Sequence, residues 1–303
     1  MNEKTTTKKK EPIVESQVAP GHRACAGCGE LLAARLVMNA AGKNVIATCA
    51  TGCLEVVSSA YPQSAWKMPW IHSLFENPTA VASGIEAALK ALGREDEANI
   101  IAQGGDGSTA DIGIGCLSGM LERGHNVLYI CYDNEAYMNT GNQRSGTTMP
   151  FAATTTTPIG QLKRGEQHIR GKLRKDMPAI MAAHGIPYIA TASIAYPADL
   201  VKKVKKAASI HGPRYIHIHC PCATGWGFPE SKTVEIARLA VQTGAWVLFE
   251  IEDGKLTVTQ KLAKKKPVKD YLIGQKRFRH ITDPEIAQIQ ELIDKKWSEL
   301  GLA

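Results

Sequence analysis

Short apolar segments alternate with amphipathic segments along most of the chain. The apolar segments are rich in Ile, Val and Tyr, which is typical of buried strands, and we expect strands at residues 44–48, 98–103, 126–133, 186–191 and 214–220. Apolar residues between them recur at helical spacing, which predicts helices at residues 28–41, 78–93, 177–184 and 198–209. Strands separated by helices predict an α/β fold, a mostly parallel sheet with helices on both faces.

The alternation weakens at both ends of the chain. Residues 1–18 are polar and rich in Lys, and we expect a flexible arm there. Residues 19–245 form the predicted α/β domain. Residues 246–303 carry a weaker pattern that ends in a helix from about Asp283, and we expect this extension to pack on the domain or on partner subunits.

Two sequence features bear on location and partners. No apolar run approaches the ~20 residues that span a bilayer, and residues 1–18 lack a secretory pattern, so we expect a cytoplasmic protein with no membrane partner. The net charge of +7 includes lysine runs at residues 8–10 and 264–266. Such runs are usually solvated, and they equally suit a surface that docks an acidic electron carrier. Aromatic residues do not interleave with them, so we expect no nucleic-acid partner.

The strongest chemical signal lies in two loops that directly follow predicted strands, where parallel sheets bind their ligands. One loop is Gly105-Asp106-Gly107-Ser108, and the other is Asp133-Asn134-Glu135-Ala136-Tyr137. Glycines let backbone amides approach a diphosphate, and oxygens of Asp106, Asn134 and one backbone carbonyl could complete the octahedron of Mg²⁺. Two ordinary tight turns are the alternative interpretation. A dinucleotide fingerprint is disfavoured, because Gly119 comes one residue too late after Gly113-x-Gly115.

The cysteines carry the second signal. Eight cysteines in a cytoplasmic chain are not a disulfide framework. Cys25-x-x-Cys28 opens a predicted helix, and Cys53 and Cys222 each follow a predicted strand. Four such thiolates suit a [4Fe–4S] cluster or zinc, and scattered buried cysteines are the alternative.

The other four cysteines leave part of that assignment open. Cys49 and Cys220 lie next to the two remote candidates and compete with them as ligands, and spacing alone does not decide between them. Cys116 and Cys131 lie in apolar patterns and are predicted core residues.

A polar stretch rich in Thr and Gly runs from Gly141 to Arg174 and contains the run Thr154–Thr157. We expect a long loop there. A loop of this length is either functional or contacts a partner.

Together, these motifs resemble the β subunit of pyruvate:ferredoxin oxidoreductase and its 2-oxoacid relatives. The resemblance rests on GHRACAGCGE, ATGC, GDGSTADIG, YDNEAYMNTGNQRSG and PCATGWG, in the right order from about Gly21 to Ala245. Several of these motifs are long, so a chance match is remote. The resemblance implies a thiamine diphosphate-binding fold.

The resemblance also implies the residues of the cofactor sites. It places a [4Fe–4S] cluster, close to the thiamine, on Cys25, Cys28, Cys53 and Cys222. It prefers Cys53 because the family's ligand follows ATG, and Cys222 because the ligand follows Pro. It places Mg²⁺ on Asp106, Asn134 and the carbonyl of Ala136, and it cradles the diphosphate in Gly105, Gly107 and Ser108.

Four further residues are implied to line the cofactor: Glu30, Tyr137, Met138 and Asn139. Catalytic roles are implied for Glu30 and for Asn139, which would lie near the reactive carbon of thiamine diphosphate.

The implied reaction is the oxidative decarboxylation of a 2-oxoacid, with pyruvate as the first expectation. Electrons would pass to ferredoxin and the acyl group to coenzyme A. Relatives take the Glu that activates the thiamine from another, α-type subunit, so this chain is expected to be inert alone. No C-x-x-C-x-x-C run is present, so further clusters are expected on a ferredoxin-like subunit.

Three alternatives remain open. Oxalate, branched-chain or aryl 2-oxoacids are possible substrates, because the discriminating residues are expected on the partner. A non-redox thiamine-dependent decarboxylase would leave the four cysteines without a role. A zinc-stabilised scaffold would leave the GDG and DNEAY loops unexplained.

Overall fold

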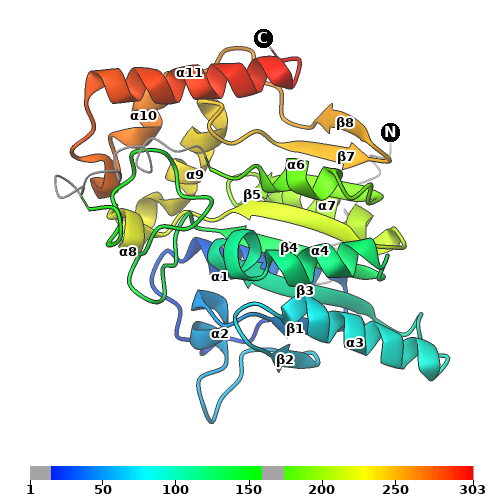
Figure 1. Ribbon diagram of the computed structural model, residues 1–303. Coiled ribbons are helices and arrows are strands. Elements are labelled where there is room, and N and C mark those ends of the chain that lie inside the picture. Colours follow the sequence, from blue (N-terminus) through cyan, green and yellow to red (C-terminus); the bar gives the residue numbers. More distant parts are fainter. Residues whose placement is uncertain (1–14, 159–173, 303) are drawn as a thin grey trace, which may run out of the picture.

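The computed structural model describes residues 15–158 and 174–302, and its centre is one eight-stranded sheet (Figure 1). The spatial order of the strands is β2-β1-β3-β4-β6-β5-β7-β8. Most of the predicted N-terminal arm and part of the predicted 141–174 loop lie outside the described residues. The strands are β1 (Val45–Cys49), β2 (Trp70–His72), β3 (Asn99–Gly105), β4 (Val127–Asp133), β5 (Tyr188–Ser193), β6 (Arg214–His219), β7 (Phe249–Glu252) and β8 (Lys255–Val258).

The pairing confirms the predicted fold class. The six strands from β2 to β5 in spatial order are parallel, and β7 and β8 add two antiparallel strands at the edge beside β5. The α-helices are α1 (Gly29–Ala41), α2 (Cys53–Ser58), α3 (Pro78–Ala91), α4 (Ile114–Glu122), α6 (Met177–Ala182), α7 (Pro197–Ser209), α8 (Ala223–Trp226), α9 (Thr233–Gln242), α10 (Val268–Leu272) and α11 (Asp283–Glu299).

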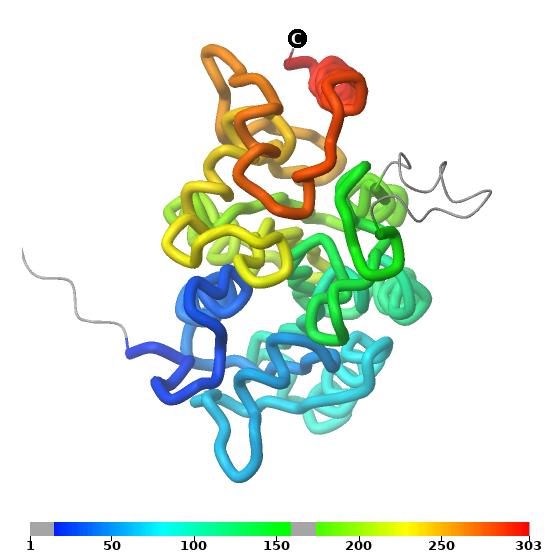
Figure 2. The backbone as a smooth tube through the Cα atoms, turned by 90° about the vertical axis from the view of Figure 1, so that its left-hand side faces the viewer, coloured from blue at the N-terminus to red at the C-terminus, as the bar shows by residue number. Residues whose placement is uncertain are grey.

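Helices cover both faces of the parallel strands, because successive strand residues point to opposite faces. In β4, Leu128 and Ile130 pack with α1 and α7, whereas Val127 and Tyr129 pack with α3, α4 and α6. Figure 2 shows α1, in blue, and α6, in green, on opposite sides of the sheet. Both faces of β4 are therefore buried, which explains its unbroken apolar sequence.

Residues after 245 join the same sheet and contribute to a third apolar cluster. This cluster packs α9, α10 and α11 around Trp226, Trp246 and Trp297. Helix α11 begins at the predicted Asp283, where Thr282 and Glu285 form a capping box. The boundary at residue 245 stays a prediction, since β7 pairs directly with β5.

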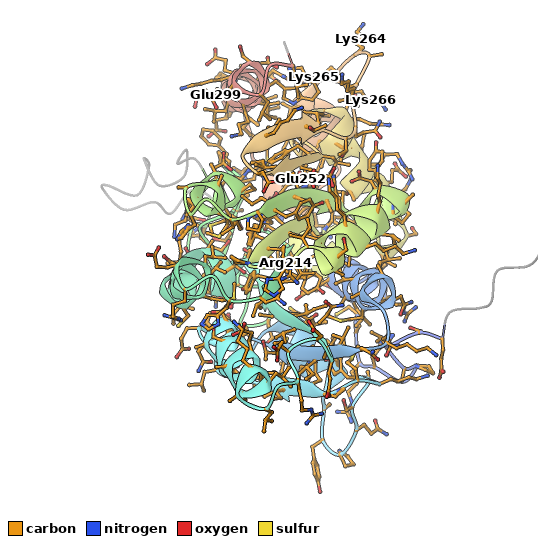
Figure 3. All side chains as sticks on the ribbon, turned by 90° about the vertical axis from the view of Figure 1, so that its right-hand side faces the viewer. Arg214, Glu252, Lys264, Lys265, Lys266 and Glu299 are labelled. Carbon is orange, nitrogen blue, oxygen red and sulfur yellow. The ribbon has the colours of Figure 1, made fainter. Side chains whose placement is uncertain are left out.

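The lysine run at residues 264–266 lies on the loop between β8 and α10, at the surface (Figure 3). Lys264 and Lys266 are exposed, whereas Lys265 pairs with Asp294 and lies over the ring of Trp297. This arrangement agrees with a solvated face. Among the described residues, no helix has both the length and the apolar character needed to cross a bilayer.

The structure differs from the predicted elements in three ways. The strand expected from residue 186 begins at Tyr188, after Pro187, which has no N–H to donate to a sheet. The helix expected to reach residue 184 ends at Ala182. Helices α2, α8, α9 and α10 and strands β2, β7 and β8 were not predicted; the three strands have only three or four residues and form by pairing with longer neighbours.

Trp297 provides a test of how firmly α11 is joined to the body. Its ring is 5% exposed, and Nε1 donates to the carbonyl of Gly244 at 3.1 Å. We expect Trp297→Ala to lower the free energy of unfolding by about 3–5 kcal/mol, because it leaves a cavity and an unpaired carbonyl. Ile273→Ala, at a side chain that is 66% exposed, should change it by less than about 0.5 kcal/mol. Urea titration followed by circular dichroism measures both, and equal effects would contradict the assignment of α11 to the folded body.

Candidate functional site

Four loops meet at the carboxyl edge of the sheet. Strand register aligns their starting points: Gly105 of β3 pairs with Tyr132 of β4, and Asp133 of β4 pairs with His219 of β6. Strand β1 lies beside β3 and ends at Cys49. The GDGS, DNEAY, ATGC and PCATGWG motifs therefore lie side by side, because the carboxyl ends of parallel strands meet at one edge of the sheet.

The loop after β3 is shaped by close backbone packing. A Cβ on Gly107 would come within 2.6 Å of Cε1 of Tyr137, and a Cβ on Gly104 within 2.5 Å of the Tyr129 hydroxyl. The chain then enters a π-helical turn, Ser108–Ile112. Such turns are rare and often mark functional sites. The Ser108 hydroxyl is already used, since it donates to the carbonyl of Phe75 at 2.7 Å.

Two oxygens in this region are buried without a hydrogen-bond partner among the described residues. They are Oδ1 of Asp106 and Oδ1 of Asn134. The Asn134 amide is oriented by Glu30, whose Oε2 accepts from Nδ2 at 3.2 Å. Buried polar atoms are normally paired, so two orphaned hard oxygens fit the donor set that Mg²⁺ takes.

Glu30 and Asp106 have unusual acidities. Burial raises the pKa of Glu30 to about 7, against the opposing effect of the Asn134 hydrogen bond. Burial, and then the nearby Asp133, raise the pKa of Asp106 well above its usual range. A positive charge beside Asp106 would oppose both causes of its raised pKa, the burial and the nearby Asp133, which again suits a divalent cation.

The loop after β4 has a strained backbone and is held by ion pairs. Glu135 has φ +61°, and its fully buried carboxylate pairs with Arg277 at 2.7 Å and with Arg174 at 3.4 Å. Asp133 pairs with His217 at 2.8 Å and also accepts from the backbone N–H of Glu135. Arg277 lies beyond the resemblance and carries no local signal, so sequence reasoning missed it.

Hydrogen bonds to the backbone fix the same loop. Nε1 of Trp226 donates to the carbonyl of Asn134 at 2.8 Å, and the Thr148 hydroxyl donates to the carbonyl of Glu135 at 2.7 Å. Ala136, the third predicted Mg²⁺ ligand, is buried directly beyond them. The loop is therefore rigid where a metal ligand set requires precision.

The next three residues are less buried: Tyr137, like Met138, is partly buried. The Tyr137 hydroxyl donates to Asp111 at 2.9 Å, Met138 is half-buried, and Asn139 is exposed. Met138 packs against α8, since a Cβ on Gly225 would lie 2.2 Å from its sulfur. Among the described residues, no contact of Asn139 identifies a catalytic role, which stays a prediction.

The four predicted cluster ligands are neighbours. Cys53 lies close enough to Cys28 and Cys222 for their charges to raise the pKa of its thiol. Cys25 affects the pKa of Cys222 in the same way. Backbone N–H groups of Leu31 and Gly225 donate to the sulfurs of Cys28 and Cys222 at 3.4 and 3.3 Å. Burial raises the pKa of Cys28 to about 12 and that of Cys53 further. Thiolates here need a cation, which a metal centre supplies.

These thiols are not yet gathered into a ligand set. Within residues 15–158 and 174–302, no group of three or more His, Cys, Asp or Glu side chains has the arrangement of a metal site. The ligand assignment therefore stays a prediction.

Burial separates the candidate ligands from their competitors. Cys49 and Cys220 are 1% and 0% exposed and lie in the apolar core, whereas Cys53 and Cys222 are half-buried at the starts of α2 and α8. This contrast supports the choice that the resemblance made. Of the two predicted core cysteines, Cys131 is fully buried and Cys116 is half-buried.

The chain is similar to a known protein family and to several known proteins. Residues 50–218 match the family described as thiamine pyrophosphate enzyme, C-terminal TPP binding domain. The chain is 57% identical over 288 residues to the pyruvate synthase subunit PorB of Methanothermobacter thermautotrophicus, which covers 95% of this chain and 98% of the relative. It is 46% identical over 292 residues to the ketoisovalerate oxidoreductase subunit VorB of Pyrococcus abyssi, with 94% and 93% covered.

A solved structure supports the fold alone. The 2-oxoglutarate:ferredoxin oxidoreductase from Magnetococcus marinus matches with a TM-score of 0.58 at 20% identity, over 95% of this chain and 90% of that chain.

The Glu135–Arg277 pair gives the prediction of this subsection. Arg277→Met removes the closer cation from a buried carboxylate, and we expect the free energy of unfolding to fall by about 3–5 kcal/mol. Lys232→Met in the exposed Lys232–Glu235 pair should change it by less than about 1 kcal/mol. The double variant Glu135→Gln/Arg277→Met should recover much of the loss in urea titrations. A single variant as stable as the parent protein would show that the pair does not hold the loop.

Proposed function

The chain belongs to the family of β subunits of 2-oxoacid:ferredoxin oxidoreductases, and from that premise we propose that it holds thiamine diphosphate, Mg²⁺ and one [4Fe–4S] cluster in such a complex. The observation that carries the cofactor assignment is the pair of orphaned oxygens on Asp106 and Asn134, beside a glycine turn. Both loops belong to the segment that matches the thiamine pyrophosphate family.

Asp106, Asn134 and the carbonyl of Ala136 would hold Mg²⁺, and backbone amides around Gly105, Gly107 and Ser108 would face the diphosphate. When bound, thiamine diphosphate supplies the electron sink for loss of CO₂ from a 2-oxoacid. The chain's own residues orient and shield this centre. Glu30 fixes the Asn134 amide, Trp226 fixes the loop carbonyl, and Tyr137 covers Gly107.

Cys25, Cys28, Cys53 and Cys222 would hold the cluster, which when bound would supply a one-electron acceptor. The fit rests on four neighbouring thiols, two of which already accept backbone N–H groups. Such hydrogen bonds to sulfur tune the potentials of iron–sulfur centres. Electrons would leave through clusters on a ferredoxin-like subunit towards ferredoxin.

Pyruvate is the favoured substrate and coenzyme A the favoured acyl acceptor. The relative named for pyruvate synthase is 57% identical to this chain, and the one named for ketoisovalerate is 46% identical. Branched-chain, aryl and oxalate substrates remain the alternatives, since an α-type subunit would hold part of the substrate and supply the activating Glu. We place the complex in the cytoplasm.

The composition of the purified complex tests this proposal. The chain is co-expressed with its partner subunits and purified anaerobically, and iron, sulfide, zinc and thiamine diphosphate are measured per chain. Beyond the clusters of the other subunits, we expect about four iron and four sulfide per chain, together with thiamine. Cys53→Ser should lose that iron, whereas Cys49→Ser, at a core cysteine, should keep it.

Other compositions would contradict the proposal. Zinc without thiamine would rule out the oxidoreductase and favour a zinc-stabilised scaffold. Thiamine without this extra iron would favour a non-redox enzyme.

Metal removal gives a second prediction. Dialysis against EDTA should release thiamine diphosphate, because the diphosphate would lose its bridging cation, and added Mg²⁺ should restore binding. Asp106→Ala should weaken thiamine diphosphate binding by more than about 100-fold, the upper end of losses from groups that only support a ligand. Asp96→Ala, at an exposed carboxylate, serves as the control. Equilibrium dialysis with labelled cofactor measures both, and retention after EDTA treatment would argue against the metal bridge.

A further inference from the structure

We propose that Ser145 and Thr147 are positioning residues for Asp106, holding one of its carboxylate oxygens so that the other stays available to a divalent cation. Both residues belong to the polar stretch whose role the sequence left open. The inference rests on the proposed Mg²⁺ site and assigns it two supporting groups that lie outside the GDG and DN motifs.

The two hydroxyls converge on one oxygen. The Ser145 hydroxyl donates a short hydrogen bond to Oδ2 of Asp106, and the Thr147 hydroxyl lies 2.9 Å from the same atom. Both side chains are buried, at 1% and 0% exposure. Oδ1 of Asp106 is buried and has no partner among the described residues. A carboxylate with two donors on one oxygen cannot rotate without breaking both bonds, so the free oxygen keeps its direction.

Thr147 also joins two carboxylates. Its Oγ1 lies 3.0 Å from Oδ1 of Asp133, as well as 2.9 Å from Asp106. A hydroxyl carries one proton and can donate to only one of them at a time. Asp133 has other donors, namely His217 and the backbone N–H of Glu135. Among the described residues, the side chains that donate to Asp106 are these two uncharged hydroxyls, so no cation pairs with its carboxylate there, and a metal at Oδ1 would provide one.

The segment that carries these hydroxyls is itself locked. The N–H of Ser145 donates to Oγ1 of Thr148 at 2.9 Å, and the N–H of Gly146 donates to Oδ2 of Asp111 at 2.9 Å. Gly146 has no room for a side chain, since a Cβ would lie 2.5 Å from Oδ1 of Asp111. Asp111 also accepts from the Tyr137 hydroxyl, so the turn after β3, the loop after β4 and the 145–148 segment form one hydrogen-bonded unit.

Supporting residues around metal ligands typically contribute 10–100-fold in affinity. The test uses Mn²⁺ as the probe and the whole complex with its partner subunits, at saturating thiamine diphosphate. Free Mn²⁺ is counted by electron paramagnetic resonance, which gives a dissociation constant without any turnover. The melting temperature of the metal-free complex is recorded alongside.

We expect Thr147→Val to weaken Mn²⁺ binding by about 10–100-fold, while Thr147→Ser, which keeps the hydroxyl, stays within about threefold of the parent protein. Thr157→Val is the matched control. That threonine is also buried and lies in the same polar stretch, but the partner of its hydroxyl among the described residues is Thr154, not Asp106. Ser145→Ala should weaken Mn²⁺ binding in the same direction, and it decides the question if Thr147→Val does not assemble.

Two results would overturn the inference while leaving the proposed function intact: unchanged Mn²⁺ affinity in Thr147→Val and Ser145→Ala, or an equal loss in Thr157→Val. A parent complex that binds no Mn²⁺ with thiamine diphosphate would overturn the metal site, and this inference with it. The Mn²⁺ affinity of the parent complex therefore distinguishes a failure of this inference from a failure of the proposed metal site.

Discussion

The carboxyl edge of the sheet gathers four buried carboxylates, and the way their charge is compensated governs the rest of the site. Glu30, Asp106, Asp133 and Glu135 are each at most 5% exposed. Burying a carboxylate is costly unless it is paired, hydrogen-bonded or protonated. The cost of burial is compensated differently for each of the four carboxylates, and these differences indicate what each one does in the site.

Glu135 and Asp133 have cationic or imidazole partners within the chain. Glu135 is held by Arg277 and Arg174, and Asp133 by His217. Burial raises the pKa of Glu30 to about 7 and that of Asp106 well above its usual range, so both carboxyls resist ionisation unless a cation is nearby. Among the described residues, the side chains that donate to Asp106 are two neutral hydroxyls, and its Oδ1 has no partner there. A metal ligand needs this combination of a fixed position, a negative charge and a free lone pair.

The same compensation links distant parts of the chain. Arg277 and Glu135 are 142 residues apart in sequence, and Ser145 and Asp106 are 39 apart. Residues after 245 therefore do more than cover the sheet: besides adding β7 and β8, they supply the cation that keeps the loop after β4 in its strained conformation. This dependence gives the C-terminal region a role in the site, although none of its residues belongs to a recognisable motif.

The sequence by itself determined the alternation of strands and helices, the glycine turn, the cysteine spacing and the start of α11. These features depend on local causes: side-chain periodicity, the absence of a Cβ, and a capping box within four residues. Only the tertiary structure decided that Cys49 and Cys220 are core residues, that β7 and β8 form strands, and that Ser145, Thr147 and Arg277 reach the site. The physical reason is that burial, strand pairing and charge compensation depend on neighbours brought together by folding. A single threonine or arginine gives no sign in the sequence of which carboxylate it will meet.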